Sequence, residues 1–409
     1  MFELRHAATA YWQATRRLTA AQLRARSERK LQTWLQTDVP RVPFYRDRQI
    51  DDLTDLPIID KATLMASFAA FNREGITASQ GWEAFATTRQ IGPIIVGAST
   101  GTSGNRGLFV ISQAERFRWL GTILGKALPG FWRQRHKVAV LLPLNTPLYD
   151  SANKLSRLKL RFFDLSGDWA NGLDDFSPTV IIAPPKILRL IAKQKLPIAP
   201  THVFSGAEQL DRLDADVIRG YFGRPVGQIY MATEGLMAVT CAQGTLHLCE
   251  DIMHFELPEV GDDPALREVI ISDFSRQTQI MARYRMNDLI RLGDPCPCGM
   301  RQQTVAEVVG RADDCFDLPG GMLTPDVLRN AVVDADRSIT DFRILQTGAD
   351  RIEVLLPEGC DPLAAQHGIE ALLHRKGMRA QVCAKTTALM PEMTRKLRRV
   401  ENRYSSAKV

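Results

Sequence analysis

The feature that most constrains the fold of this 409-residue sequence is the alternation of short apolar runs with amphipathic stretches after about residue 95. The apolar runs have the length of buried strands, and the stretches between them carry the 3.6-residue period of helices. This alternation is typical of an α/β fold with mostly parallel strands. The predicted strands are Val138–Leu142, Val180–Ala183, His202–Ser205 and Val226–Tyr230, and the predicted helices are Lys186–Lys195 and Leu210–Tyr221.

The remaining segments indicate what surrounds this α/β region. The first forty residues carry apolar side chains at helical spacing and predict helix. Strand-like runs at Glu268–Asp273 and Ile280–Arg285 lack long helices between them, which predicts an attached, more antiparallel β subdomain.

The pattern starts again after Arg311. Strands are predicted at Phe342–Gln346, Arg351–Leu356 and Ala380–Lys385, with a helix at Leu363–Lys376. This is the size of a small α+β domain. We therefore predict a large domain over residues 1–311 and a small C-terminal lobe over residues 312–409.

Composition excludes some classes of protein. No run of 18 uncharged apolar residues occurs, so no membrane span is expected. The N-terminal residues include an acid and several arginines where a secretory signal needs an apolar stretch, and a cytoplasmic location is the expectation. The seven cysteines form no disulfide pattern, which favours reduced thiols, some of them able to hold a metal.

The sequence is moderately basic, with 52 Lys and Arg against 46 Asp and Glu. A basic balance suggests an anionic partner, and a nucleotide, coenzyme A, an acidic carrier protein or nucleic acid would all fit. Nucleic acid is disfavoured, because the basic residues are not interleaved with aromatic ones.

A loop rich in glycine and hydroxyl groups follows the apolar run Ile94–Val96. Its glycines let backbone N–H groups approach a ligand, its hydroxyls add neutral donors, and an arginine adds positive charge, so the loop could wrap a polyphosphate. It is not a G-x-x-x-x-G-K-[ST] loop, and the alternative is a flexible surface turn. The candidate phosphate-binding residues are Ser99, Thr100, Gly101, Thr102, Ser103, Gly104 and Arg106.

This loop resembles the phosphate-loop signature of the adenylate-forming superfamily, which includes acyl- and aryl-CoA ligases, peptide-synthetase adenylation domains and luciferases. The superfamily usually has lysine where this chain has Arg106. The resemblance implies that the protein uses ATP and Mg²⁺ to activate a carboxylic acid as an acyl-AMP, releasing pyrophosphate, and then passes the acyl group to a thiol.

The segment Tyr230–Gly235 resembles the Tyr-Gly-x-Thr-Glu motif of the same superfamily. The resemblance implies that Tyr230 packs on adenine, Thr233 contacts the α-phosphate and Glu234 holds Mg²⁺, for which a carboxylate is a suitable ligand. Met231 replaces the usual glycine. Alone, the segment could be a turn at the end of a strand.

Two further segments match in the same order along the chain. Residues 205–208, Ser-Gly-Ala-Glu, resemble the Gly-Gly-Glu segment that lines the adenine and acyl pocket and makes Glu208 a nucleotide-binding candidate. Residues 284–288 resemble Tyr-Arg-Thr-Gly-Asp, which implies that Asp288 binds the ribose hydroxyls. Met286 and Asn287 depart from that pattern.

Two C-terminal segments resemble motifs of the superfamily that act as the hinge between domains and as the site of the catalytic lysine. Gly310–Asp314 resembles the hinge motif, in which Arg311 would reach the nucleotide and Asp313 would be the pivot. Residues 393–399 resemble Pro-Lys-Thr-x-x-Gly-Lys, which implies that Lys396 is the catalytic lysine, although Arg395 replaces the glycine. Neighbouring basic residues leave the register open, and the alternative is a solvated basic helix.

A cysteine-rich turn, Cys-Pro-Cys-Gly at residues 296–299, predicts a metal site. Cys241 and His247 lie upstream in a hairpin-like stretch and complete a set typical of tetrahedral Zn²⁺, with Cys249 as an alternative ligand. Four protein ligands leave no open position, so the predicted zinc is structural.

This turn, followed by the hinge motif, resembles the phenylacetate–CoA ligase-like branch, as do residues 42–45 and 56–61. The short length and basic tail further resemble ligases of xanthomonadin-type pigment pathways, which load hydroxybenzoates onto an acyl carrier protein. An aryl acid such as a hydroxybenzoate is therefore the expected substrate, with a medium-chain fatty acid left open. The acid-pocket candidates are Asn145, Tyr149, Ser205, Gly206, Met231 and Ala232.

The acceptor is predicted from charge. Residues 375–409 hold ten Lys or Arg against two Glu, which favours an acidic carrier protein over free coenzyme A. The departures from the motifs leave a different class open, a catalytically silent scaffold with the same fold.

Overall fold

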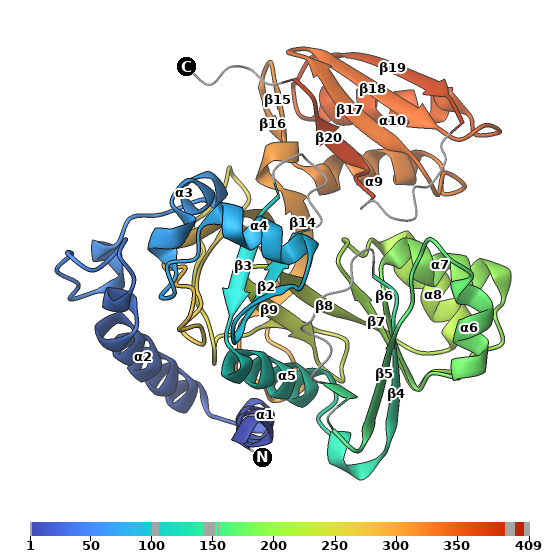
Figure 1. Cartoon of the computed structure of the whole chain (residues 1–409). Coiled ribbons are helices and arrows are strands. Elements are labelled where there is room, and N and C mark those ends of the chain that lie inside the picture. Colours follow the sequence, from blue (N-terminus) through green and yellow to red (C-terminus); the bar gives the residue numbers. More distant parts are fainter. Residues whose placement is uncertain (1, 100–105, 143–151, 154, 389–396, 405–409) are drawn as a thin grey trace.

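The fold is described by a computed structural model (Figure 1), which covers residues 2–99, 106–142, 152–153, 155–388 and 397–404. A large body is followed by a C-terminal lobe, drawn in orange and red above it. Mixed helices and sheets confirm the predicted α/β class. None of the described helices has both the length and the apolar character needed to cross a lipid bilayer.

The predicted N-terminal helical region forms two helices, α1 (Phe2–Thr15) and α2 (Ala20–Thr37). They are separated because Thr19 caps α2: its side chain accepts from the Gln22 N–H, and the Gln22 side chain accepts from the Thr19 N–H. The inner face of α2 buries Leu23, Leu31, Trp34 and Leu35.

Helix α5 (Gln113–Ala127) lies against α1 at very close range. A Cβ at Gly121 would lie 2.0 Å from the carbonyl oxygen of Ala7, so only glycine permits this approach. The buried Glu115 near the start of α5 accepts from the N–H groups of Gln277 (2.6 Å) and Thr278 (2.9 Å). Helix α5 is thereby fixed to a loop that borders the main cavity.

The parallel half of the main sheet runs in the order β5-β4-β6-β7-β8. Strands β4, β6 and β7 are mostly apolar and buried, as parallel strands between layers usually are, whereas the edge strand β5 exposes Lys159 and Arg161. The strands are β4 (His136–Val140), β5 (Leu158–Phe162), β6 (Val180–Ala183), β7 (His202–Gly206) and β8 (Val226–Ala232), and the helices covering one face are α6 (Trp169–Phe176), α7 (Pro185–Gln194) and α8 (Arg212–Phe222).

The antiparallel strands predicted after this region continue the same sheet instead of forming a separate one. They follow β8 in the order β9-β10-β14-β13-β12-β11, which makes eleven strands in all among the described residues. Their bounds are β9 (Gly235–Thr240), β10 (Leu246–Leu248), β11 (His254–Glu256), β12 (Leu266–Ser272), β13 (Tyr284–Leu292) and β14 (Thr304–Arg311).

The strand predicted at residues 280–285 begins only at Tyr284. The preceding residues are buried, and the Ile280 N–H donates to the carbonyl oxygen of Phe71 at 2.9 Å. The apolar run therefore packs against the N-terminal region instead of lengthening the sheet.

A small sheet carries the flanks of the predicted phosphate loop. Strands β2 (Ile94–Ala98) and β3 (Leu108–Ile111) are antiparallel, and β1 (Gln90–Ile91) pairs with β2. Helices α3 (Lys61–Ala66) and α4 (Ala78–Ala86) lie nearby in Figure 1.

The C-terminal lobe has its own core, built from residues between Phe316 and Val400. Its four-stranded sheet has the order β19-β18-β17-β20, and β20 is parallel to β17. The elements are β15 (Phe316–Leu318), β16 (Gly321–Leu323), α9 (Pro325–Ala335), β17 (Arg343–Gly348), β18 (Arg351–Leu356), α10 (Pro362–Arg375), β19 (Gln381–Thr386) and β20 (Val400–Asn402).

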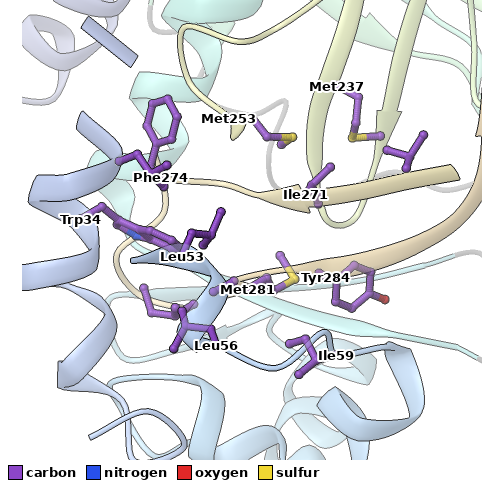
Figure 2. Close-up of a cluster of buried hydrophobic side chains, with 14 of the residues drawn as sticks. Trp34, Leu53, Leu56, Ile59, Met237, Met253, Ile271, Phe274, Met281 and Tyr284 are labelled. Carbon is purple, nitrogen blue, oxygen red and sulfur yellow. The ribbon is translucent and has the colours of Figure 1, made fainter. Parts of the chain in front are cut away.

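A large apolar cluster joins the N-terminal region to the antiparallel half of the sheet (Figure 2). Trp34 of α2 lies beside Phe274, and Ile271 of β12 lies near Met281 in the same view. Tyr284 is only 2% exposed, and its ring belongs to this cluster while its hydroxyl reaches the cavity wall described below. The core therefore fixes the position of a polar group at the site.

Candidate active site

A cavity of about 470 Å³ lies between the body and the lobe. It is lined from segments that are far apart in the sequence, including the ends of β2, β7 and β8 and residues just before β20. Ten predicted site residues line it together: Ser99, Ser205, Glu208, Tyr230, Met231, Ala232, Thr233, Glu234, Asp288 and Arg311.

Glu234 lies in the tight turn between β8 and β9, and hydroxyl groups hold both oxygens of its carboxylate. Thr233 Oγ1 donates to Oε2 at 2.6 Å, and the Tyr284 hydroxyl donates to Oε1 at 3.0 Å. Burial, together with the charge of Glu234, raises the pKa of Tyr284, so this phenol stays protonated as a donor. Glu234 is thus a fixed carboxylate in the cavity wall.

The turn that presents Glu234 requires glycine at its next position. Gly235 has φ of 156°, and a Cβ there would lie 2.7 Å from the Met253 side chain and 3.0 Å from Asp273 Oδ2. Arg276 supports the turn by donating to the Thr233 carbonyl oxygen at 2.7 Å. Sequence reasoning missed Arg276, because no local motif distinguishes it.

Tyr230 and Asp288 form a hydrogen-bonded pair beside this turn. The Tyr230 hydroxyl donates to Asp288 Oδ2 at 2.6 Å. Burial and the nearby negative charge of Asp288 raise the pKa of Tyr230 well above its ordinary value, so it too remains a donor. The pair places a carboxylate next to an aromatic ring, which suits recognition of a nucleoside.

Asn287 occupies the left-handed backbone region, with φ of 61°. Asparagine tolerates this conformation better than most residues, so the departure from the Thr-Gly-Asp pattern keeps a glycine-like backbone. Its side chain bonds to Asp313 in both directions: Nδ2 donates to Asp313 Oδ2, and Oδ1 accepts from the Asp313 N–H at 3.2 Å. Asp313 does not line the cavity, and its carboxylate also pairs with Arg311 at 3.3 Å.

Glu208 contacts both the body and the lobe. Lys186 Nζ of α7 lies 3.0 Å from Glu208 Oε1, and the Leu397 N–H donates to the same oxygen at 3.2 Å. Lys186 also lines the cavity, yet the sequence indicated only that it starts a helix. The neighbouring Gly206, at the end of β7, does not line the cavity.

Several predicted residues are placed elsewhere or lie outside the described residues. The Arg106 guanidinium packs over the rings of Trp82 (5.1 Å) and Phe85 (5.7 Å) and does not line the cavity. Ser99 and Gly107 join the loop ends, since the Ser99 N–H donates to the Gly107 carbonyl oxygen at 2.8 Å. The predicted residues outside the description are Thr100, Gly101, Thr102, Ser103, Gly104, Asn145, Tyr149 and Lys396.

The four predicted metal ligands come together at the end of the antiparallel half of the sheet. Their ligand atoms lie within 4.8 Å of one another. Cys241 and His247 flank the β9–β10 turn, and Cys296 and Cys298 lie between β13 and β14. Cys249 is not in this cluster, because β10 ends at Leu248 and the chain then turns into a buried region.

The spacing inside this cluster agrees with tetrahedral zinc. Zn–S bonds of about 2.3 Å and Zn–N bonds of about 2.1 Å place sulfurs about 3.8 Å apart and sulfur and nitrogen about 3.6 Å apart. The corresponding distances here are 3.7 Å for Cys241 Sγ to Cys296 Sγ and 3.4 Å for Cys298 Sγ to His247 Nε2. His247 Nδ1 lies 3.2 Å from the Gln302 carbonyl oxygen, the outer contact expected of a metal-binding histidine.

Part of the basic charge near the C-terminus is neutralised within the structure. Arg398 pairs with Asp314, and Arg399 pairs with Asp211 and Asp214. Lys385 and Arg403 also pair with glutamates. Among the described basic residues after 374, only Arg375, Lys376 and Arg379 are exposed and form no ion pair, so part of the positive charge counted in the sequence is neutralised within the protein.

Comparison with known proteins identifies the class to which this fold corresponds. No protein-family model matches the chain. Protein CapK of Staphylococcus aureus is 23% identical over 216 residues, which are 49% of this chain and 48% of CapK. The chain therefore matches about half the length of this curated relative.

Solved ligases share the fold more completely. 2-Hydroxyisobutyryl-CoA ligase in the postadenylation state has a TM-score of 0.71 at 18% identity, with 94% of this chain and 90% of that chain covered. The same ligase in the thioesterification state has a TM-score of 0.57 at 19% identity and the same coverage. The o-succinylbenzoate CoA synthetase of Bacillus subtilis, with its acyl-adenylate OSB-AMP, has a TM-score of 0.53 at 13% identity, covering 73% and 66%.

The fold is therefore that of the adenylate-forming acid–CoA ligases. The resemblance to that superfamily seen in the sequence is confirmed at the level of fold. Within the described residues, several segments that carried the resemblance contribute to the cavity lining, among them residues 230–235 and Asp288.

The Tyr230–Asp288 pair gives a direct test of nucleotide binding. Replacing Asp288 with Asn removes a carboxylate that could accept two bonds from a ribose diol, so the KM for ATP should rise about tenfold to a hundredfold. The KM for the acid should change little. Steady-state kinetics with ATP and acid varied separately would check this, and equal increases in both values would contradict the assignment.

Proposed function

We propose that this protein is an ATP-dependent ligase, which activates a carboxylic acid as an acyl-AMP and transfers the acyl group to a phosphopantetheine thiol. One observation carries the proposal: a single cavity collects a fixed carboxylate, a tyrosine–aspartate pair and the end of a glycine-rich loop. A catalytic lysine at Lys396 would belong to the segment that enters this cavity at Leu397.

In the first step a substrate carboxylate oxygen attacks the α-phosphorus of ATP, and pyrophosphate leaves. The protein supplies no nucleophile, so its residues act by positioning and by charge neutralisation. Thr233 would contact the α-phosphate, Asp288 the ribose and Arg311 the nucleotide. Glu234 would hold Mg²⁺, which supplies positive charge to the phosphates.

In the second step a thiol displaces AMP from the acyl carbon. The proposed division at residue 311 would let the lobe over residues 312–409 rotate about Asp313 between the two steps. The separate core of the lobe supports this division, as do the contacts that Asp313 makes with Asn287 and Arg311 of the body. Domain rotation lets one site serve two reactions.

The acid is proposed to be aromatic, for example a hydroxybenzoate. Phe109, Trp119 and Ile229 line the cavity and would suit a flat ring. The acceptor thiol would belong to a carrier protein or to coenzyme A. Exposed Arg375, Lys376 and Arg379 favour an acidic carrier, whereas the solved ligase neighbours use coenzyme A.

The cysteine and histidine cluster is proposed to hold a structural Zn²⁺. All four ligand positions would be filled by the protein, so the ion would clamp the β9–β10 hairpin to the loop before β14. The cluster's ligands do not line the cavity, which separates this role from catalysis.

ATP–pyrophosphate exchange tests the proposed activity. Purified protein with Mg²⁺ should show exchange that depends on an added acid, across benzoate, its 3- and 4-hydroxy forms, phenylacetate, cinnamates and fatty acids. Thioester formation with carrier protein or coenzyme A would then identify the acceptor. If folded, metal-containing protein gave no exchange with any acid, the ligase proposal would be rejected in favour of a silent scaffold.

A further inference from the structure

A network of four charged side chains, three of them buried and Asp211 21% exposed, joins the lobe to the body at the edge of the cavity. Arg399 precedes β20 of the lobe, Arg189 lies on α7, and Asp211 and Asp214 lie at the start of α8. Asp211, Asp214 and Arg399 also line the cavity. Two arginines face two aspartates, and Arg329 near Asp211 and Asp341 near Arg399 add one charge of each sign around them.

In this network an arginine of the lobe donates to aspartates of the body, and an arginine of the body donates to a carbonyl oxygen of the lobe. Arg399 Nη1 pairs with Asp211 and lies 3.1 Å from Asp214 Oδ2. Arg189 Nη1 pairs with Asp214 Oδ1 at 2.7 Å. The Thr340 carbonyl oxygen of the lobe accepts from Arg189 at 2.9 Å and from Arg399 at 3.2 Å.

The side chains of the network are sufficiently buried that removing one of them should destabilise the contact between lobe and body. The side chains of Arg399, Arg189 and Asp214 are only 8%, 10% and 2% exposed. Surface ion pairs contribute little, but removing one partner of a buried pair leaves an uncompensated charge. At an interface between two parts of a chain, separation of the parts returns the uncompensated charge to water, so its loss of a partner favours the separated arrangement.

The position of Arg399 connects this network to the chemistry. Arg399 lies three residues after Lys396, and the intervening Leu397 donates its N–H to Glu208 in the cavity wall. The whole chain is also more similar to the postadenylation state of a solved ligase than to its thioesterification state. The network therefore occurs in an overall arrangement of body and lobe that is more like the postadenylation state.

We propose that Arg399, Arg189, Asp211 and Asp214 form an ionic latch that holds the lobe in the adenylate-forming orientation. Arg399 is a positioning residue, which anchors residues 397–400 at the edge of the cavity, three residues after Lys396 in the sequence. The latch must open before the lobe can rotate, so it favours the first half-reaction over the second. The half-reaction part of this inference rests on the proposed ligase activity.

The test is Arg399→Gln in the full-length chain, with the two half-reactions measured separately. Acid-dependent ATP–pyrophosphate exchange should fall about a hundredfold, mainly in kcat. Thioester formation from supplied acyl-adenylate should stay within about twofold, because it does not use the latched orientation. Arg399→Lys should recover part of the exchange, since lysine keeps the charge but offers fewer directed bonds. An equal fall in both half-reactions, or no fall in either, would overturn the latch.

Arg403→Gln is the matched control. Arg403 lies four residues further on in the lobe, and its ion pair with Glu401 is half exposed, so both half-reactions should be unchanged. A loss of exchange in this control equal to that of Arg399→Gln would show a general effect of charge and overturn the proposal.

Hydrogen–deuterium exchange gives a readout that needs no enzyme activity. Arg399→Gln should speed amide exchange in residues 208–216 and 338–342, which meet at the latch, and leave β6 and β18 unchanged. Unchanged exchange at the interface would refute the latch even if the enzyme is active. Absence of activity in the wild-type protein would refute the ligase proposal alone.

Discussion

Replacing Glu234 with Gln should lower acid-dependent ATP–pyrophosphate exchange by about a thousandfold. The carboxylate is the proposed ligand of Mg²⁺, and an amide is a much weaker ligand for this hard cation. Thr233 and Tyr284 both donate to Glu234, so the substitution also leaves two hydroxyls facing an amide that can accept at only one of its two terminal atoms. The loss should appear in kcat and in the Mg²⁺ dependence.

Two variants make this result interpretable. Tyr284→Phe keeps the carboxylate but removes one of its supports, so exchange should fall only about tenfold. Glu259→Gln changes the same charge at a 70% exposed side chain paired with Arg267, and exchange should be unchanged. If Glu234→Gln retained more than about a tenth of the activity, Glu234 would not be the metal ligand.

Replacing Cys298 with Ser should abolish metal binding at the proposed zinc site. Wild-type protein is expected to contain about one zinc per chain, and the variant should lose it on dialysis, because serine is a poor ligand for this soft, thiolate-rich set. The melting temperature should also fall, since metal-binding energy contributes to folding. Elemental analysis and thermal unfolding would measure both effects.

Cys383→Ser is the control for this experiment. Cys383 is exposed on β19 of the lobe and outside the cluster, so metal content and melting temperature should not change. Chelator treatment of the wild type should lower its melting temperature toward that of Cys298→Ser. A wild-type protein that contains no metal as purified and binds none when zinc is added would exclude the proposed zinc.

Local sequence patterns predicted the helices and strands well where a buried apolar run is bounded by turn residues or prolines. The prediction of β6 at Val180–Ala183 matches the structure, because an apolar run of strand length follows a turn and precedes the Pro184-Pro185 start of α7. The motif residues at the ends of β7 and β8 also meet in one cavity, as expected when parallel strands end at one edge of a sheet.

Contacts between distant segments could not be predicted in the same way. Arg399 and Asp214 are 185 residues apart, and the sequence offered Arg399 only as one more residue of a basic segment. Cys249 shows the opposite case, in which residues close in sequence are separated in space. It is near His247 in sequence, but β10 ends at Leu248 and the chain then turns away from the metal-ligand cluster. The positions of such residues depend on tertiary packing, which has no local signature.

The parallel pairing of β20 with β17 has a consequence for how the protein is made. The strands of the body and most of the cavity wall are complete once the ribosome has passed residue 311, so the body can begin to fold during synthesis. The lobe's sheet must wait for residues 400–402, which are translated more than fifty residues after β17. Each nascent chain thus passes through a stage in which the body's share of the cavity wall has been synthesised but the lobe's share has not, and the segment that includes Lys396 and Arg399 is added only at the end of that stage.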